Sequence, residues 1–453
     1  MQADFSGGHL SSDGGCLLLR QVDVGLGLCS TLANCFTDLR DAQLIDHTVS
    51  ELLAQRIHAL ALGYEDLNDH QTLRLDPLLA VAAGKVDPTG RNRLHDKTCA
   101  MAAPSTLNRF ELGNNIKDRY HKISYNPQRI EEALLEFSVR SLPKHATQVV
   151  LDLDGMGHLL HGMQEGRHFS AYYDNWCYQP LYIVAGDLLL WAQLRTGECD
   201  AKDDVVSALK KIIPAVRRRC KHARILVRGD SGFCRQEIMA LCQQERDVYY
   251  VLGVGKNSKL VDRIEAQLMM AAAKRCLTGL DNAREFTEFE YQARSWDCSR
   301  RLVAKAEVTA QGQNPRFVVT NLPAKGFKGE SPLEAQVIYE EVYCARGNME
   351  NILKQQVLDL QADRMSTHYL ASNQLRLWLA SFAYVLIERL RAVGLTGTQL
   401  EKATAGTIRV KLLKVAAAVK VSVRRVYVQM SSAFVMRDVF AQCLRRLRAW
   451  QPG

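Results

Sequence analysis

The sequence lacks an apolar run long enough to cross a bilayer. Its two most apolar stretches, residues 181–194 and 377–390, are interrupted by Asp187 and by Glu388 with Arg389. Both are shorter than the roughly 18 unbroken apolar residues that a membrane span needs. No basic region followed by an apolar region stands at the N-terminus, so we expect no secretory signal. We therefore expect a protein that has no membrane partner.

The cysteines form no recognisable pairing or metal-binding pattern. Thirteen of them are scattered from Cys16 to Cys443, and none belongs to a C-x-x-C pair, which excludes the commonest zinc and redox motifs. The pattern is typical of buried thiols in a reducing cytoplasm. Repeats and low-complexity tracts are also absent, and 47% hydrophobic with 24% charged residues is an ordinary globular composition. The 453 residues predict about two or three folded domains and exclude the disordered and fibrous classes.

The sequence has no acidic surplus, and its positive charge is gathered at one end. Lys and Arg number 58 against 49 Asp and Glu, which gives a net charge of +9. Residues 405–453 hold ten basic residues and one acid, Asp438, so this segment alone accounts for the +9 and the other 404 residues balance. A basic segment of this kind suits a polyanion, with nucleic acid as the first candidate. A solvated basic face explains the charge equally well.

The first part of the chain has a helical pattern. In residues 49–62 the apolar side chains recur at helical spacing, and Gly63 ends the run. Further helical segments begin near Pro104 and Pro127. We therefore predict an all-helical N-terminal domain over residues 1–143.

After Pro143 the pattern changes to strands and helices. Short β-rich runs at residues 148–154, 178–184 and 187–194 predict an antiparallel meander. A helix, a strand, a helix and a strand follow, which gives the order β-β-β-α-β-α-β. The predicted fold class is α/β. Its parts are the first part of a core (144–280), a β-rich insertion (281–325) and the second part of the core with an acid-bearing helix (326–404). A basic C-terminal segment (405–453) follows, with a strand at 419–428 and a helix at 436–448.

Acidic residues stand where buried elements end. Asp152 and Asp154 lie two apart on a predicted strand and so project from one face. Asp230 ends another apolar run, and Glu350 lies on a predicted helix. Two strand-end carboxylates and a helical one could hold a pair of divalent ions against a phosphodiester. Each Asp taken singly is more often a turn residue or a helix cap.

The surroundings of Glu350 contain groups suited to phosphate. Tyr343 and Arg346 precede it, and Lys354 follows it by one helical turn. One arginine guanidinium can bind two phosphate oxygens at once. The alternative is a surface Glu–Lys pair worth only a few tenths of a kcal/mol.

The pattern Tyr343-x2-Arg346-x3-Glu350, with Asp154 and Asp230 at strand ends and a β-rich insertion before Glu350, resembles the DDE transposases of bacterial insertion sequences. More narrowly, the chain is similar to the insertion-sequence 1380 family. The segments that carry this similarity span nearly the whole chain; they are residues 63–70, 73–77, 105–111, 151–154, 172–173, 177–182, 228–233 and 422–425.

The resemblance implies an RNase H-like catalytic core in which Asp154, Asp230 and Glu350 bind two Mg²⁺ ions, and we expect Mn²⁺ to substitute. It implies cut-and-paste transposition on double-stranded DNA, at both the element ends and the target, by a homodimer whose N-terminal domain binds the ends. The expected location is the bacterial cytoplasm, at the nucleoid. Asp152 shares the face of Asp154, and we prefer Asp154 as the first acid because it is nearer the end of the strand.

One position departs from that family. A Lys commonly follows the Glu by seven residues, and Val357 stands there in this chain. Lys354 lies on the same side of the helix as Glu350, so we give it the phosphate role. Tyr343 and Arg346 complete the predicted DNA contacts of this helix.

Further DNA contacts are predicted outside the acidic cluster. Related transposases hold a flipped base on an aromatic residue of the insertion, for which Trp296 is the candidate here; a tryptophan on a strand is more often a core residue. In the basic segment the candidates for phosphate contact are Arg424, Arg425, Arg445, Arg446 and Arg448. His158, His161 and His168 show no fourth ligand for zinc, and we assign no metal to them.

Three functions are compatible with the sequence. The first is a metal-dependent DNA transposase, the second is a DNA-binding protein that keeps the fold without the chemistry, and the third is an RNase H-like nuclease without strand transfer. The intact acids argue against the second. Whether a target DNA becomes joined to the cut end separates the first from the third.

Overall fold

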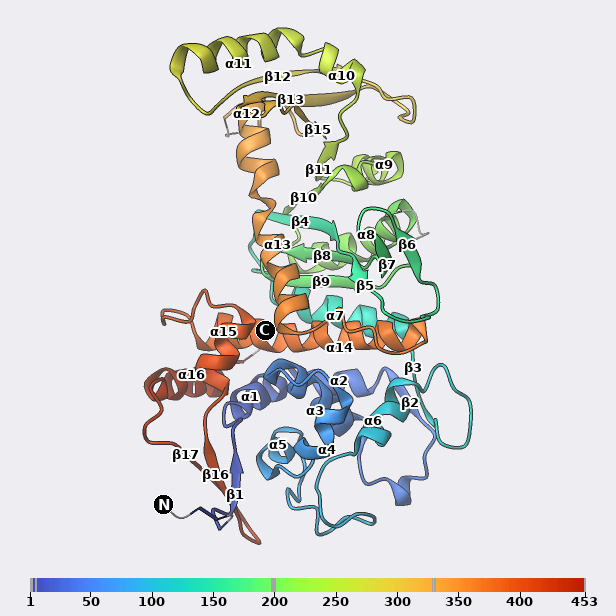
Figure 1. The fold of residues 1–453 in the computed structure, drawn as a ribbon, viewed down its shortest axis with the longest axis vertical. Coiled ribbons are helices and arrows are strands. Elements are labelled where there is room, and N and C mark those ends of the chain that lie inside the picture. Colours follow the sequence, from blue (N-terminus) through green and yellow to red (C-terminus); the bar gives the residue numbers. More distant parts are fainter. Residues whose placement is uncertain (1–2, 5, 197–200, 328, 330, 452–453) are drawn as a thin grey trace.

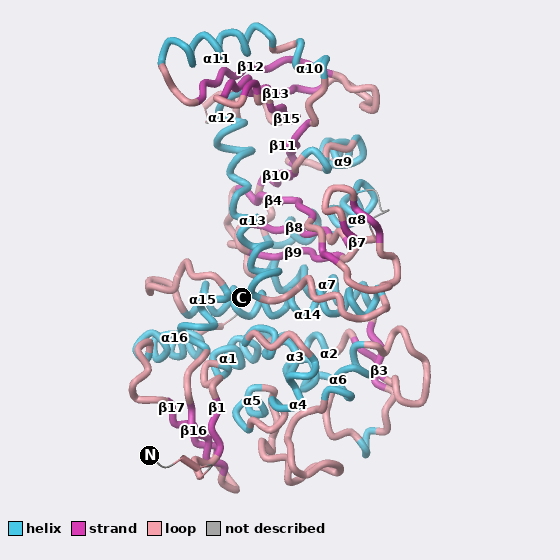
Figure 2. The backbone as a smooth tube through the Cα atoms, viewed as in Figure 1, coloured by secondary structure: helices cyan, strands magenta, loops and turns pink. Residues whose placement is uncertain are grey.

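The computed structural model describes residues 3–4, 6–196, 201–327, 329 and 331–451. A nine-stranded mixed sheet forms the centre of the chain, with strands in the order β12-β13-β15-β11-β10-β4-β8-β9 and the short β14 paired to β13 (Figure 1). The mixed α/β class predicted from the sequence is confirmed in this form. In Figure 2 the strands of the sheet follow one another along the molecule, from β9 beside the helical lower half to β12 at the far end.

Five strands of this sheet make up the core. They are β4 (Gln148–Gly155), β8 (Leu181–Ala185), β9 (Leu188–Gln193), β10 (Arg224–Gly229) and β11 (Val248–Val254). β4, β8 and β9 are antiparallel neighbours, as the meander predicted, while β10 runs parallel to β4 and β11 runs parallel to β10. The carboxyl ends of β4 and β10 therefore lie at one edge of the sheet.

The two faces of β4 have different neighbours. Val149, Leu151 and Leu153 pack in one cluster with apolar side chains of α8 (Ala201–Arg219) and α9 (Gln236–Gln244). The intervening residues, which include Asp152 and Asp154, face the other side because side chains alternate along a strand. The shared face predicted for the two Asp residues is thus confirmed.

The β-rich insertion extends the core sheet. Its strands are β12 (Asn282–Tyr291), β13 (Arg300–Thr309), β14 (Gly312–Gln313) and β15 (Arg316–Thr320). β15 pairs with β11 in antiparallel register, Val251 opposite Thr320, and so joins the insertion to the core. α10 (Ser258–Asp262) and α11 (Glu265–Thr278) precede these strands, and α11 packs on β12 and β13 at the end of the molecule remote from both termini (Figure 1).

The prediction of an all-helical N-terminal domain is wrong in detail. The helices are α1 (Cys16–Leu26), α2 (Leu28–Ala33), α3 (Val49–Leu62), α4 (His70–Leu73), α5 (Pro77–Ala82), α6 (Pro104–Glu111) and α7 (Pro127–Arg140). Three short strands accompany them: β1 (His9–Ser11), β2 (Phe36–Asp38) and β3 (Ile123–Tyr125). Strands of three residues are too short to show alternation, and their partners are distant in sequence, β3 for β2 and β16 for β1.

Helix α3 shows how local sequence sets an element. Thr48 accepts the backbone N–H of Glu51 while the Glu51 carboxylate accepts that of Thr48, which is a capping box, and Gly63 ends the helix in the left-handed region at φ 90°. Its neighbour α14 (Leu370–Arg389) is apolar on nearly every side because it lies between α3 and β9. In the described part of the chain no helix is both long and apolar enough to cross a membrane.

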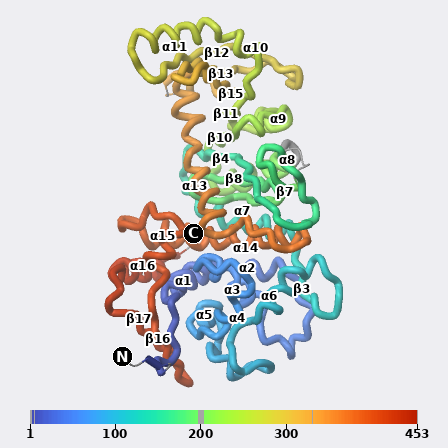
Figure 3. Tube along the Cα trace, in the orientation of Figure 1, coloured from blue at the N-terminus to red at the C-terminus, as the bar shows by residue number. Residues whose placement is uncertain are grey.

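The C-terminal segment folds back onto the N-terminal helices (Figure 3). It comprises α15 (Ala405–Ile408), β16 (Ala417–Val421), β17 (Val426–Met430) and α16 (Arg437–Ala449). The single strand predicted at 419–428 is instead a hairpin whose turn is residues 422–425, closed by the bond from Ser422 N to the Arg425 carbonyl at 2.8 Å. β1 pairs with β16, and α1 contacts α16.

A second small sheet lies between β4 and β8 in sequence. It consists of β5 (His158–Leu159), β6 (His168–Ser170) and β7 (Asn175–Tyr178), in the order β5-β7-β6. The predicted strand 178–184 is thereby split after Tyr178. Pro180 explains the break because it has no N–H for a sheet ladder.

Candidate active site

The three predicted acids come from three elements of the core. Asp154 lies near the end of β4 and is half-buried, whereas Asp230 directly follows β10 and is exposed. Since β4 and β10 are parallel neighbours, with Asp152 opposite Arg228, both carboxylates emerge at the same edge of the sheet. Glu350 is exposed on α13 (Gly347–Lys354).

The pKa of Asp154 responds to both of the other acids. Burial raises the pKa of Asp154 to about 6, the charges of Asp230 and Glu350 push it the same way, and Arg346 and the Gly155 N–H oppose the rise. A carboxylate feels like charges in this way only when they are close. The structure therefore gathers Asp154, Asp230 and Glu350 into one negatively charged site.

The described residues contain one compact set of potential metal ligands, and it lies outside this site. In the described part of the chain, one set of three potential ligands has all its ligand atoms within 4.8 Å of one another, and that set is Asp23, Cys29 and His58. Asp154, Asp230 and Glu350 do not form such a set. All three supply carboxylate oxygens, which are the ligands that Mg²⁺ and Mn²⁺ prefer.

Asp152 is occupied by another partner. It is 4% exposed, and its two oxygens accept from Nε and Nη2 of Arg228 at 2.7 and 2.8 Å. A buried carboxylate in a two-bond pair with arginine is already neutralised. This arrangement favours Asp154 over Asp152 as the first acid.

Arg228 also joins the sheet to the Glu350 helix. Its Nη1 donates to the Val342 carbonyl at 2.6 Å and its Nη2 to the Ala345 carbonyl at 3.3 Å. Residues 338–346 form irregular π and 3-10 turns that lead directly into α13. A second tie comes from Asn348, whose Nδ2 donates to Asp187 Oδ1 at 2.9 Å in the β8–β9 turn. Together these bonds fix where Glu350 stands relative to the strands.

Sequence reasoning missed Arg228 and Asn348. A signal for Arg228 was present, because a charged residue that directly follows the apolar run Ile225-Leu226-Val227 on a buried strand must find a partner. Asn348 carried no such signal, since its partner lies more than 160 residues away.

Tyr343 and Arg346 lie beside the acids. Arg346 Nη2 is 4.0 Å from Asp154 Oδ2 and donates to the Leu153 carbonyl at 3.4 Å. Its buried Nε has no hydrogen-bond partner among the described residues. The Tyr343 hydroxyl approaches Gly253 so closely that a Cβ there would be 2.7 Å from it. Lys354 is exposed one turn beyond Glu350.

Comparison with known proteins identifies the family. The family model described as "Transposase DDE domain group 1" matches residues 1–452. The chain belongs to the DDE transposase family. No curated protein sequence matches it. Among solved structures, a piggyBac transposase synaptic complex with hairpin DNA aligns with 88% of this chain and 79% of that one, at a TM-score of 0.43 and 10% identity.

In this DDE transposase family member, Trp296 is buried. It lies in the loop between β12 and β13, not on a strand, and is 6% exposed. Its ring meets Tyr291 edge-on at 5.7 Å, and the Arg300 guanidinium lies 5.6 Å from its centre. The arrangement supports the core role for Trp296 over base stacking.

The basic segment of the transposase divides into two groups. Three of its ten basic residues, Arg409, Lys414 and Arg446, are half-buried, and the other seven are exposed. Arg446 donates to the carbonyls of Gly394 and Thr396, so it holds α16 against the loop that contains these two residues. Arg445 and Arg448 are exposed on α16, and Arg424 and Arg425 are exposed in the hairpin turn. Arg424 and Arg425 therefore do not lie on a continuous strand at 419–428, as predicted, but in the turn between β16 and β17.

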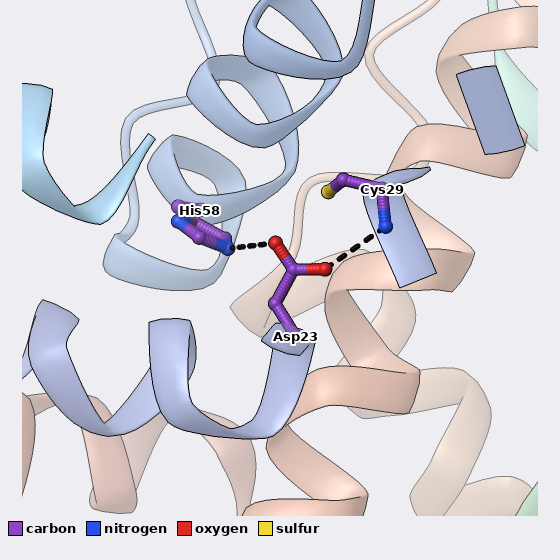
Figure 4. A group of neighbouring side chains, drawn as sticks. All are labelled: Asp23, Cys29 and His58. Atoms are coloured by element: carbon purple, nitrogen blue, oxygen red, sulfur yellow. Dashed lines mark hydrogen bonds and ion pairs between the residues drawn. The ribbon is translucent and has the colours of Figure 1, made fainter. Parts of the chain in front are cut away.

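The structure buries His158 and, in a separate cluster, His58. His158 is fully buried, and burial lowers its pKa to about 3. The Asp23–Cys29–His58 cluster joins α1, α2 and α3: Asp23 accepts from the Cys29 N–H at 2.9 Å and lies 3.2 Å from His58 Nε2 (Figure 4). Because its carboxylate is engaged on both oxygens and the described residues supply no fourth ligand, this cluster is a structural link between helices.

Proposed function

We propose that the chain is a DNA transposase that binds the terminal inverted repeats of a mobile element, cuts DNA at the ends and joins the freed 3′-hydroxyl to a target. The observation that carries this proposal is that Asp154 and Asp230 stand at the ends of neighbouring parallel strands, while Arg228 bonds the same strands to the turns that lead into the Glu350 helix. The order β9-β8-β4-β10-β11, with its antiparallel meander and parallel second half, supports an RNase H-like core. Membership in the DDE family supports the same chemistry.

Two Mg²⁺ ions, or Mn²⁺ in their place, fit the donor set, with Asp154, Asp230 and Glu350 as ligands. Bound there, they would supply Lewis-acid stabilisation of the attacking and leaving oxygens of the phosphodiester. The unbalanced negative charge of the three acids, opposed nearby by Arg346, favours cations.

The chain's own groups position the DNA in this proposal. Arg346 offers its guanidinium, 4.0 Å from Asp154, to a phosphate oxygen beside the acids, and Lys354 offers a second cation on the exposed side of α13. Tyr343 orients the DNA backbone beside the acids. Residues 1–143 and the exposed arginines of 405–453 form one body and bind the duplex outside the cleavage site, in a homodimer that holds two ends.

The test is a cleavage and joining assay on the element ends found in the flanking DNA, with Mg²⁺ and a target plasmid. We expect nicks at the ends and covalent joining of the donor to the plasmid. Nicking without joining would indicate an RNase H-like nuclease. Specific binding without nicking in Mg²⁺ or Mn²⁺ would indicate a DNA-binding protein without the chemistry.

A further inference from the structure

Exposed aromatic residues gather on the small sheet that follows the first acid. Six aromatic side chains of the described residues are strongly exposed, and four of these six fall within residues 169–176. Their exposed fractions are 44% for Phe169, 87% for Tyr172, 39% for Tyr173 and 40% for Trp176. Large aromatic rings are normally buried, so a group of exposed ones marks a surface that binds something. We call these four residues the aromatic face.

The rings of the aromatic face meet one another edge-on, in two pairs. Phe169 and Trp176 are cross-strand partners on β6 and β7 and meet edge-on at 5.8 Å. Tyr172 and Tyr173 meet edge-on at 4.9 Å. In an edge-on pair one ring keeps both faces clear of its partner, and the 87% exposure of Tyr172 leaves room for a flat group to stack on it. The Arg167 guanidinium lies 4.3 Å from the centre of the Trp176 ring, which adds a cation to the surface.

The aromatic face begins beside the catalytic strand. Gly157, three residues after Asp154, donates its N–H to the Tyr173 hydroxyl at 3.1 Å. A Cβ at Gly157 would lie 2.3 Å from the Tyr173 ring, so only glycine permits this contact. The ring therefore rests on the backbone that leaves the active site.

The small sheet is held in place before any ligand binds. Gln164 donates to the Met365 carbonyl at 2.9 Å, the Glu165 N–H donates to the His368 carbonyl at 2.8 Å, and the Glu165 carboxylate accepts from the Leu370 N–H at 3.0 Å. These bonds connect it to the segment that enters α14. The aromatic face is thus preorganised beside the acids.

We propose that the aromatic face stacks unpaired DNA bases next to the scissile phosphate, with Tyr172 and Trp176 as the principal rings and Arg167 on the backbone between them. Aromatic rings interleaved with a cation are the chemistry of single-strand binding, and stacking on them tolerates any base. Bases in an intact duplex already stack on their neighbours, so the face selects a strand that has left the duplex. This inference rests on the proposed function, which places DNA at the acids.

The test measures binding by fluorescence, without divalent metal, to two probes. One is a blunt terminal-repeat duplex, and the other is the same duplex with a three-nucleotide single-stranded flank containing 2-aminopurine. For the flanked probe we expect Trp176→Ala and Tyr172→Ala each to weaken binding about 5- to 150-fold, the equivalent of about 1–3 kcal/mol per stacked base. Binding of the blunt probe should be unchanged. Wild-type protein should quench the 2-aminopurine, and the variants should not.

The controls separate this inference from folding and from the proposed function. Met269→Ala removes an apolar side chain that is 62% exposed on α11 and should change neither probe, and Trp176→Phe should keep most of the affinity. The stacking role would be overturned if Trp176→Ala and Tyr172→Ala lost the same affinity for both probes or lost none. It would also be overturned if the wild-type protein left the 2-aminopurine fluorescence unquenched. Because no cleavage is measured, a failure of the transposase proposal would appear in the joining assay instead.

Discussion

At the scale of single residues, Asp154 and Asp152 differ in the charges that surround them. Both lie on one face of β4, yet Asp152 is neutralised by Arg228, whereas Asp154 has only the longer contact with Arg346, at 4.0 Å, and its pKa is raised by burial and by the charges of Asp230 and Glu350. The sequence placed both on one face but could not choose between them, because the partner of Asp152 is 76 residues away. Proximity to the end of the strand was a weaker criterion than the ion pair.

The raised pKa of Asp154 predicts a pH dependence. Its pKa of about 6 in the fold exceeds the ordinary 3.8, so without metal the stability linked to this group is present below pH 4 and is lost as pH rises through 6. Metal binding requires the ionised form, so Mn²⁺ affinity should fall by about tenfold per pH unit below 6 if one proton is displaced. Calorimetric titration at pH 5 to 7.5 checks this, and a flat profile, or the same profile in Asp154→Asn, would contradict it.

Gly253 on β11 predicts a second residue-level effect. A Cβ there would lie 2.7 Å from the Tyr343 hydroxyl and 3.0 Å from the Ser231 nitrogen, just after Asp230. Gly253→Ala should therefore displace Tyr343 or Asp230 and lower the single-turnover cleavage rate by about 10- to 100-fold, with DNA binding intact. Gly255→Ala is the matched control, since its Cβ would meet nothing within 4 Å. Equal rates for the two variants would refute this role.

At the scale of elements, the position of α13 depends on Arg228. Its guanidinium bonds Asp152 and the carbonyls of Val342 and Ala345, which ties β4 and β10 to the turns before Glu350. Arg228→Lys keeps the positive charge but removes the planar guanidinium, whose several N–H groups bond Asp152 and the two carbonyls at once. We expect a loss of about 1–3 kcal/mol in the free energy of unfolding, together with a slower single-turnover cleavage rate at temperatures where the variant is fully folded.

A readout beyond stability decides whether Arg228 positions Glu350. If it does, Arg228→Lys lowers the cleavage rate while the affinity for DNA stays within about twofold, and Mn²⁺ affinity falls. If stability alone changes and the rate of the folded variant equals that of wild type, Arg228 has no positioning role.

Element order was predictable from the sequence, whereas strand partners were only partly so. The meander, the α8 to β11 succession and the β-rich insertion follow from periodicity and turn residues. The joining of the insertion to the core through β15 and β11, the pairing of β1 with β16 and the small β5-β7-β6 sheet do not, because short strands show little alternation and their partners are set by tertiary packing.

At the scale of the whole molecule, the two chain ends form one body with α14. Apolar residues of α1, α3, α14 and α16 belong to one hydrophobic cluster, so the basic segment is part of the folded core and not a free arm. Composition alone located the net charge of +9 at residues 405–453, but it could not separate the cations that bond within the fold from those that are exposed. The fold uses Arg409, Lys414 and Arg446 internally and leaves seven cations exposed.

This division predicts how binding responds to salt. Replacing Arg445 and Arg448 with serine should reduce the slope of log affinity against log salt by about 0.9 for each phosphate that is no longer neutralised, so by up to about 2. Arg446→Ser should lower the melting temperature and leave the slope unchanged, since its bonds are to Gly394 and Thr396. An unchanged slope in the double variant would exclude these arginines from the DNA interface.

The central claim is that Asp154, Asp230 and Glu350 form one catalytic site, and single-turnover cleavage of a terminal-repeat substrate in Mg²⁺ tests it most directly. We expect Asp154→Asn, Asp230→Asn and Glu350→Gln each to lose at least about a thousandfold in rate, equal to about 4 kcal/mol, while duplex binding persists. Glu341→Gln, an exposed acid nine residues before Glu350, should cleave like wild type. Cleavage retained within tenfold in any of the three acid variants would contradict the claim.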